Sequence, residues 1–486
     1  MPYSNESDEN QIKRICFVCV GEKYLSDEIE QTGEMGECSY CCETEISWTI
    51  HKLAEQIEVA FEQHYTRTSD QPDSWQERML ADKESTYDWD REGTPVLEAI
   101  EYAAEIPQEA AVDALELLED KHADFESAIM GEETEFSFES YYEEKGFSDQ
   151  TWQAEWHYFE QSLRSEARFF SRTAAAHLAS IFGDIDRLKT RDGRFLVVDA
   201  GPQFALEHLY RARVFQSDEK LKIALCRPDL HLGSPPARLA TSGRMNARGI
   251  SVFYGATDAS VAIAEIRPPV GSKAAVARFS IIRPLRLLDL TSLEDAYDEG
   301  SIFDPSLKKR LEKVSFLRTL GRRITRPVMP DDQDFDYLAT QAIADFLATE
   351  NEPRLDGIIF QSAQSQDGRN VVLFHKAARV KTIKFPEGTE IKARTGYETE
   401  DGWELEYSVN EKVLPQITSK TSKPKDFFEH TLLYSTVCHW ENDLRDMTLQ
   451  INLESVEVHH VDWVQVQSTS HKVDRHRSET QDWDFN

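Results

Sequence analysis

Three side chains that could act together on a nucleotide lie within the stretch Gly243–Pro268. Arg244 belongs to a Gly-rich turn, and Tyr254 ends a strand expected to begin at Ile250. Glu265 lies on an expected helix that Asp258 would cap. A guanidinium binds phosphate oxygens, an aromatic ring stacks on a planar base, and a carboxylate stabilises positive charge. This set suits a nucleotide whose bond between sugar and base is to be broken; the alternative is a structural Arg–Glu pair beside a core Tyr.

Two cysteine pairs near the N-terminus form a second candidate site. Cys16 and Cys19 are followed by 18 residues and then by Cys38 and Cys41. Each pair can form a tight knuckle that directs two thiolates at one point, and four thiolates complete a tetrahedron around zinc. Disulfides are the alternative, which a cytosolic setting disfavours. We therefore expect a structural zinc ion with a closed shell and no nucleophilic role, and Cys42 as a spare thiol or an alternative ligand.

Further segments around the central stretch carry a resemblance. Leu209–Arg213 precedes that stretch, and Asp356–Ser362 and Asn370–Phe374 follow it. In this order the segments resemble the RES family, which is named for its Arg, Glu and Ser. The likeness consists of five motif blocks and covers about 206–376.

The resemblance implies a compact α+β fold related to ADP-ribosyltransferases. It also implies the activity of bacterial toxins that consume NAD by hydrolysis or phosphorolysis, or that transfer ADP-ribose to a protein. NAD would be the substrate, and an antitoxin or regulatory protein is an implied partner. Met245 departs from the family pattern, in which an aromatic residue often follows the Gly-Arg turn. The resemblance implies NAD binding by Arg211, Arg244 and Tyr254, and catalytic roles for Tyr254, Glu265 and Ser362.

Composition limits the class of protein. The chain has 486 residues and a formal net charge of −34, which argues against non-specific nucleic-acid binding because that needs a basic surface. Between Asp70 and Glu160, 27 Asp or Glu stand against 5 Lys or Arg. The chain has no apolar run near the length of a membrane span, and its first residues are too polar for a signal peptide. We expect a cytoplasmic protein with no membrane segment.

Cysteine spacing, apolar periodicity and the resemblance together divide the chain into six expected parts. Apolar residues at steps of three and four predict an all-α domain over 44–190, with helices over 44–65, 96–104 and 107–118 and one long helical stripe over 152–181. This order of zinc knuckle, helical domain and RES segment resembles proteins with an N-terminal HEPN/RES domain. The expected parts are a disordered tail over 1–14, a zinc knuckle over 15–43, the helical domain over 44–190, the RES domain over 205–378, a β-rich extension over 379–466, and a polar tail over 467–486.

A second catalytic possibility lies in the helical region. HEPN domains that cut RNA carry Arg, four residues, then His, and Arg172 and His177 have this spacing. On a helix these two positions lie about 140° apart, and His177 falls within the apolar stripe, so a packed His beside an exposed Arg is the simpler interpretation. The sequence leaves three functions open: an NAD-consuming enzyme, an RNase acting through His177, and a non-catalytic interaction module.

Overall fold

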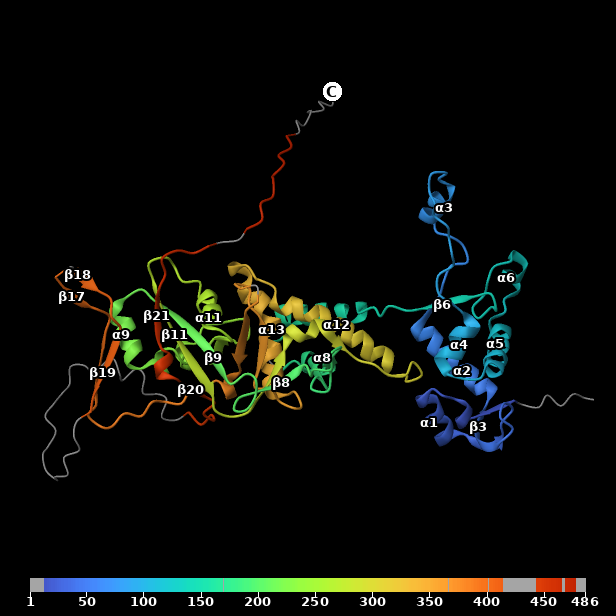
Figure 1. Cartoon of the computed structure of the whole chain (residues 1–486), viewed down its shortest axis with the longest axis horizontal. Helices are drawn as coiled ribbons and strands as arrows, with labels where there is room; N and C mark the ends of the chain where they lie inside the picture. The colour runs from blue at the N-terminus through green and yellow to red at the C-terminus, as the bar shows by residue number, and fades with distance from the viewer. Residues whose placement is uncertain are drawn as a thin grey trace, which may run out of the picture. The chain divides into compact units, whose positions relative to one another are not determined.

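The computed structural model describes residues 13–168, 170–365, 367–400, 402–413, 443–465 and 468–477 (Figure 1). Residues 1–12 of the expected N-terminal tail, and 467 and 478–486 of the expected C-terminal tail, lie outside the described residues. The chain divides into two compact units. The first comprises Met1–Leu196 and Ser292–Ile324, and the second comprises Val197–Thr291 and Thr325–Asn486. The first unit thus includes a segment from inside the expected 205–378 range.

The first unit begins with a small sheet that surrounds the cysteines. Its strand order is β1-β3-β2, and both pairings are antiparallel. Four helices of this part, α1, α2, α4 and α5, bury their apolar stripes in one core, which includes Leu53, Ile57 and Phe61. The elements of this part are β1 (Arg14–Cys16), η1 (Phe17–Cys19), α1 (Lys23–Thr32), β2 (Glu34–Glu37), β3 (Thr44–Thr49), α2 (Ile50–His64), α4 (Val96–Ala104) and α5 (Gln108–His122).

The expectation of an all-α domain over 44–190 is wrong, because this region also contains strands. Thr44–Thr49 pairs with β1 and β2 as a strand, and the helix begins only at Ile50, where the hydroxyl of Thr49 accepts a hydrogen bond from the N–H of Lys52. A second small sheet follows, with the order β4-β6-β5. Its strands are β4 (Tyr65–Arg67), β5 (Thr94–Pro95) and β6 (Tyr141–Glu144).

The expected helical stripe over 152–181 consists of two helices, α7 (Gln150–Ser165) and α8 (Arg172–Phe182). The second helix has its own N-cap, because the hydroxyl of Ser171 accepts a hydrogen bond from the N–H of Ala174. The remaining elements of this unit are α3 (Ser74–Ala81), α6 (Phe125–Met130), β7 (Lys189–Thr190), η3 (Leu290–Asp295), β13 (Ala296–Tyr297) and α12 (Leu307–Thr325), of which η3 begins and α12 ends in the second unit.

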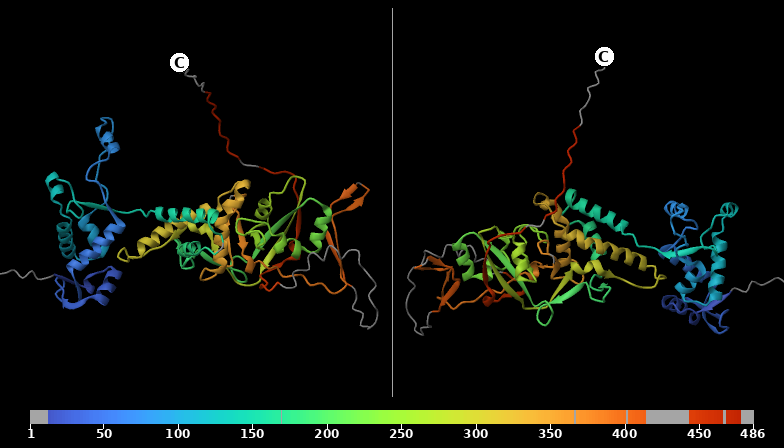
Figure 2. Two further views of the ribbon diagram at one scale, coloured as in Figure 1. Left: turned by 180° about the vertical axis from the view of Figure 1, so that it is seen from behind. Right: turned by 45° about the horizontal axis from the view of Figure 1, so that its top comes forward.

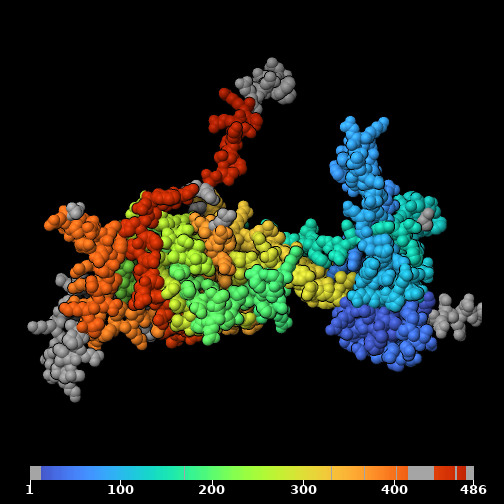
Figure 3. Space-filling view, in the orientation of Figure 1, coloured from blue at the N-terminus to red at the C-terminus, as the bar shows by residue number. Residues whose placement is uncertain are grey.

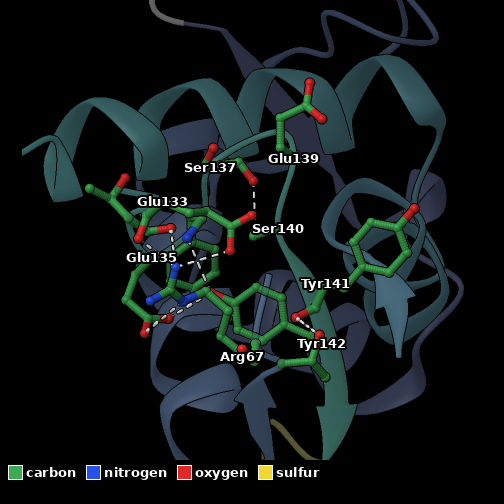
Figure 4. A network of polar contacts seen from close by, with 12 residues as sticks. Arg67, Glu133, Glu135, Ser137, Glu139, Ser140, Tyr141 and Tyr142 are labelled. Carbon is green, nitrogen blue, oxygen red and sulfur yellow. Dashed lines mark hydrogen bonds and ion pairs between the residues drawn. The ribbon is translucent and has the colours of Figure 1, made fainter. Parts of the chain in front are cut away.

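A network of polar contacts stabilises the second small sheet (Figure 4). The carboxylate of Glu133 lies 3.0 Å from Nη1 of Arg67 and 2.7 Å from Nη2 of Arg91. Hydrogen bonding to Glu133 raises the pKa of Arg91 despite its partial burial. The hydroxyl of Tyr142, on β6, donates to Glu135 at 2.7 Å. These contacts hold the 133–135 segment against β4 and β6, so some of the acidic residues in this tract have a structural role.

The second unit is built on a mixed sheet with the order β20-β11-β9-β10-β15-β14-β12-β8, and β21 pairs with β11. All pairings are antiparallel except that of β12 with β14. Figure 2 shows this sheet from two further directions. Its strands are β8 (Val197–Ala200), β9 (His208–Phe215), β10 (Phe253–Ala256), β11 (Lys273–Ile281), β12 (Leu285–Asp289), β14 (Gly357–Gln361), β15 (Arg369–Leu373), β20 (Leu449–Ile451) and β21 (Glu457–His460).

Alternate side chains of the sheet enter two cores on its opposite faces. One core contains Leu209, Ala275 and Phe279, and the helix α9 (Asp218–Cys226) contributes Leu221 and Leu225 to it. The other contains Ala212, Ala256 and Val276, with Val261 and Ala262 from the helix α11 (Ala259–Glu265). Successive side chains of a strand point to opposite faces of the sheet, so neighbouring residues of one strand enter different cores. The unit also contains α10 (Pro228–His231) and α13 (Gln333–Thr349).

Strands also lie within 379–466, the range of the expected β-rich extension. β20 and β21 join β11 at the sheet, and Figure 3 shows the segment around β21, in red, on the surface of this unit. Residues 401, 414–442 and 466 of the extension lie outside the described residues. The other strands form two separate pairs, β16 (Glu390–Arg394) with β19 (Ser408–Lys412) and β17 (Tyr397–Thr399) with β18 (Gly402–Glu404).

Candidate active site

Four neighbouring strands of the second unit bring the expected site residues together. Among the described residues, β9 pairs with β10 only at Ala256↔Tyr210. The two strands are therefore no longer hydrogen-bonded to each other beside Arg211 and Tyr254. A cavity of about 400 Å³ opens there, which is within the usual size of a small-molecule site. Arg211, Arg244, Tyr254 and Glu265 all line this cavity.

Glu265 is held by two hydrogen-bond donors. It is the last residue of α11, which Asp258 precedes at the N-cap position, although the Asp258 side chain does not cap the helix. Oε1 of Glu265 accepts from Oγ of Ser362 at 2.5 Å and from Nδ2 of Asn370 at 2.7 Å. The N–H of Gln364 donates to Oγ of Ser362 at 3.0 Å, which directs the hydroxyl proton of Ser362 toward the carboxylate. Both donors contact Oε1, so Oε2 is left for a ligand.

Ser362 therefore contacts Glu265 on the side away from the cavity. It follows β14 directly, is buried, and is outside the set of described residues that line the cavity. Its expected part in catalysis would be to position the carboxylate rather than to touch a substrate. Asn370, on β15, lines the cavity beside Glu265 and was assigned no role from the sequence. The available signal was an amide at the start of the apolar run Asn370–Phe374.

Tyr254 is fixed by the Gly-rich turn. The expected strand 250–254 is shifted, because β10 spans Phe253–Ala256. The hydroxyl of Tyr254 donates to Oδ1 of Asn246 at 2.9 Å and accepts from the N–H of Met245 at 3.0 Å. Burial raises the pKa of Tyr254 to about 12, so the phenol is neutral at physiological pH. With both roles of the hydroxyl in use, the ring is the part of Tyr254 that remains for stacking.

Gly243 is needed for this arrangement. A Cβ at Gly243 would lie 2.7 Å from both Oδ1 of Asn246 and the hydroxyl oxygen of Tyr254, which is closer than side chains approach. Met245, which replaces the aromatic residue of the family pattern, is buried and presents its backbone N–H to Tyr254. The contact with Tyr254 uses the backbone N–H of Met245, so it does not require an aromatic side chain at this position.

Arg244 is positioned by α13. Its Nη2 donates to the carbonyl of Arg326 at 2.8 Å, and its guanidinium lies over the ring of Tyr337 at 5.3 Å. Thr340 Oγ1 donates to the backbone carbonyl of Arg244 at 2.5 Å. Burial lowers the pKa of Arg244, while Tyr337, Tyr254 and Glu265 oppose this shift. Tyr337 was not foreseen, since nothing near Arg244 in the sequence indicates that α13 lies beside it.

Arg211 is the more buried of the two guanidinium groups. Burial and the neighbouring charge of Arg213 lower its pKa, but a guanidinium remains protonated at neutral pH. Its Nη1 is buried and has no hydrogen-bond partner among the described residues. Phe253 covers the guanidinium at 5.0 Å. A buried cation of this kind is stabilised by an anion, so a ligand that places a phosphate group in the cavity would satisfy it.

The comparison with known protein families matches residues 209–393 to the RES domain. The chain contains a RES domain. This match includes Arg211, Arg244, Tyr254, Glu265 and Ser362, and it continues beyond the expected end at 378 into β16. Neither the comparison with curated proteins nor that with solved structures found a match. The family is consistent with an enzyme that acts on NAD.

The four N-terminal cysteines, outside the RES domain, lie together. Sγ of Cys16 is 3.6 Å from Sγ of Cys41, Sγ of Cys38 is 3.8 Å from Sγ of Cys19, and all four sulfurs are within 4.8 Å of one another. Four sulfurs around zinc at about 2.3 Å would be about 3.8 Å apart. All four are free thiols, and the cluster does not include the exposed Cys42. The cluster could therefore hold a metal ion such as zinc.

Backbone N–H groups also support this cluster. The N–H of Cys16 donates to Sγ of Cys38 at 3.4 Å. Burial raises the pKa of Cys38, but hydrogen bonds from the N–H groups of Tyr40, Cys41 and Cys16 outweigh it and bring the pKa to about 7. The N–H of Cys42 closes a turn onto the carbonyl of Cys38. Such a knuckle directs its thiols to one point, as a tetrahedral metal requires.

His177, the alternative RNase residue, is packed against aromatic rings. Its ring centroid is 5.4 Å from that of Phe159 and 6.1 Å from that of Trp156, and its Nδ1 is 3.6 Å from Glu155. Burial lowers the pKa of His177, so the neutral ring is favoured. Arg172, by contrast, is exposed at the start of α8. This geometry favours a packing role over a shared catalytic site.

We expect His177→Ala to lower the free energy of unfolding by about 1–2 kcal/mol, because it leaves a cavity between aromatic rings. Thermal melting checks this, and Arg172→Ala, at an exposed position, should leave melting unchanged. The packing interpretation fails if His177→Ala keeps the wild-type melting temperature yet abolishes RNA cleavage or toxicity.

None of the described helices combines the length and the apolar character needed to cross a membrane.

Proposed function

We propose that the RES domain consumes NAD by breaking the bond between nicotinamide and ribose. The observation that carries this proposal is the carboxylate of Glu265, which lines the cavity with Oε1 held by Ser362 and Asn370. A preorganised carboxylate stabilises positive charge where that charge develops. The same cavity is lined by two guanidinium groups that match a pyrophosphate and by a tyrosine ring that can stack on a base.

In the proposed reaction, these side chains bind NAD and stabilise charge on its ribose. The bond between C1′ and the nicotinamide nitrogen breaks, and its electron pair passes to nicotinamide, which leaves as a neutral base. Positive charge then grows on the ribose in an oxocarbenium-like state, as in glycoside cleavage. Oε2 of Glu265 would hold a ribose hydroxyl and stabilise this charge. A nucleophile then bonds to C1′, with loss of its proton when it is water.

Three acceptors fit this chemistry. Water would give ADP-ribose, inorganic phosphate would give its 1″-phosphate, and a protein side chain would give an ADP-ribosylated protein. The test is to incubate the purified chain with NAD, with and without phosphate, and to identify the products by mass spectrometry. Release of nicotinamide with one of these products supports the proposal, and intact NAD after long incubation would reject it.

Arg244 gives a prediction about binding. We expect Arg244→Ala to raise KM for NAD by about 10- to 100-fold with a smaller change in kcat, because it removes a charge-assisted contact worth about 1.5–3 kcal/mol. Steady-state kinetics measure this, with Arg248→Ala as the matched control, since Arg248 is an exposed arginine of the same turn outside the cavity. A structural Arg–Glu pair would instead lower the melting temperature without a selective change in KM.

We further propose that the four clustered cysteines hold a structural zinc ion in an N-terminal region of the HEPN/RES type. The support is the spacing of the four sulfurs, which matches a tetrahedral site without rearrangement. The cluster lies where β1 and the β2–β3 connection meet, so a bound ion would fasten this sheet.

An enzyme that destroys NAD needs restraint in the cell, for which an antitoxin or regulatory protein is the proposed partner.

A further inference from the structure

We infer that Asn370 is a positioning residue for Glu265, whose amide holds Oε1 of the carboxylate so that Oε2 faces the substrate. The inference rests on the proposed function and concerns the same cavity. Asn370 lines the cavity and its Nδ2 lies 2.7 Å from Oε1 of Glu265. An amide nitrogen can donate but cannot accept, so this contact fixes Oε1 of Glu265 as the accepting oxygen.

The backbone of Asn370 is fixed from two sides. β15 lies between β10 and β14, and Asn370 is opposite Ala256 on one side and Phe360 on the other. Asn370 is 6% exposed. Asn370 therefore presents its amide from the middle of a sheet, which holds a donor more accurately than a loop does.

Glu265 needs such a fixed partner because of where it lies. It ends a helix of seven residues, and the next residue, Ile266, is already the C-cap. Ser362, the other donor, follows the end of β14 and is connected to Gly368 through a backbone hydrogen bond across the 363–367 loop. Asn370 is thus the only one of the three residues placed inside a strand with neighbours on both sides.

Asn370→Asp is the most informative change, because it keeps the shape and adds a charge. Two carboxylates in contact share a proton, so one ionisation of the pair moves to higher pH. Below that pH the protonated carboxyl introduced by the substitution can still donate to Oε1 of Glu265. Above it, the donor is lost and two negative charges face each other. Activity should therefore fall as pH rises through the upper ionisation of the pair.

We expect kcat of this variant to fall by about 10- to 100-fold relative to wild type on the high-pH side, with KM changed far less. Lowering the pH should restore much of the difference. Asn370→Ala should lose kcat at every pH, because it has no proton to regain. A loss in Asn370→Asp that is uniform with pH and follows a lower melting temperature would overturn the inference.

Asn351→Asp is the matched control. Asn351 is also a buried asparagine of the second unit, and its Nδ2 donates to the carbonyl of Pro353 at 2.9 Å, outside the cavity. This variant should melt at a lower temperature and keep the wild-type pH profile. A pH profile altered in the same way by Asn351→Asp would also overturn the inference.

A second measurement does not depend on NAD. In protein labelled with ¹³C at the Glu carboxyl carbons, the Glu265 signal is the one that Glu265→Gln removes. Its carboxyl chemical shift at a fixed neutral pH should differ between Asn370→Ala and wild type, because the substitution removes a hydrogen bond to Oε1. An unchanged chemical shift overturns the inference, whereas failure of wild type to consume NAD with a changed chemical shift overturns only the proposed function.

Discussion

Glu265→Gln is expected to lower kcat for NAD consumption by about 100- to 1,000-fold, or about 3–4 kcal/mol of transition-state stabilisation. The affinity for NAD should change little. The charge of Glu265 acts on the ribose only as the bond to nicotinamide breaks, and an interaction made only in the transition state is seen in kcat. Rapid-mixing kinetics and calorimetric titration with NAD measure the two quantities separately.

The contacts of Glu265 allow this substitution to remove the charge while keeping the hydrogen bonds. The amide oxygen of Gln can accept the same hydrogen bonds from Ser362 and Asn370 that Oε1 accepts in wild type. Folding should therefore survive, and thermal melting checks it. A control is Glu207→Gln, which neutralises an exposed glutamate of the same unit outside the cavity and should leave kcat unchanged. A lower melting temperature in Glu265→Gln with unaltered chemistry would favour the structural interpretation.

Replacing both Cys16 and Cys38 by serine is expected to remove one zinc ion per chain and to unfold the small N-terminal sheet. Zinc bound by four thiolates contributes on the order of 10–16 kcal/mol of apparent free energy in small metal-binding peptides, much more than a sheet of three short strands supplies alone. Cys16 ends β1 and Cys38 follows β2, so the ion would join both edges of the sheet. Elemental analysis and melting of the N-terminal region measure the two effects.

Cys42→Ser is the matched control for this prediction. Cys42 is next to Cys41 but exposed and outside the cluster, so its replacement should retain zinc and stability. Purified wild-type protein that is folded and metal-free, with disulfides between these cysteines, would contradict the zinc proposal. So would loss of the metal from the Cys42→Ser protein alone.

The sequence predicts the candidate site best where a residue type is informative by itself. Arg244, Tyr254 and Glu265 could be singled out because their chemistry matches a nucleotide. Arg211 could be selected through the resemblance, and the structure brings all four to one cavity. Ser362 could be selected only through the resemblance, and its contact with Glu265 depends on the end of β14 meeting the end of α11. Asn370 and Tyr337 could not be selected, because their importance comes from strand order and from the placement of α13.

Local signals explain the errors in the fold. Ile46 and Ile50 are four residues apart and fit a helix, yet Thr44–Thr49 also alternates and has two strands to pair with. Pairing with partners distant in the sequence overrides local periodicity, and a single sequence does not contain the partners' positions. In the same way, the aromatic stripe over 152–181 is real on each helix, but the break at Ser171 depends on a capping hydrogen bond.

The most direct measurement of the central claim is the time course of free nicotinamide when NAD is incubated with equal amounts of folded wild-type and Glu265→Gln protein. We predict steady release by wild type and release slower by about 100-fold or more in the variant, with similar NAD affinity. Equal release by the two proteins, or no release by either, would contradict it.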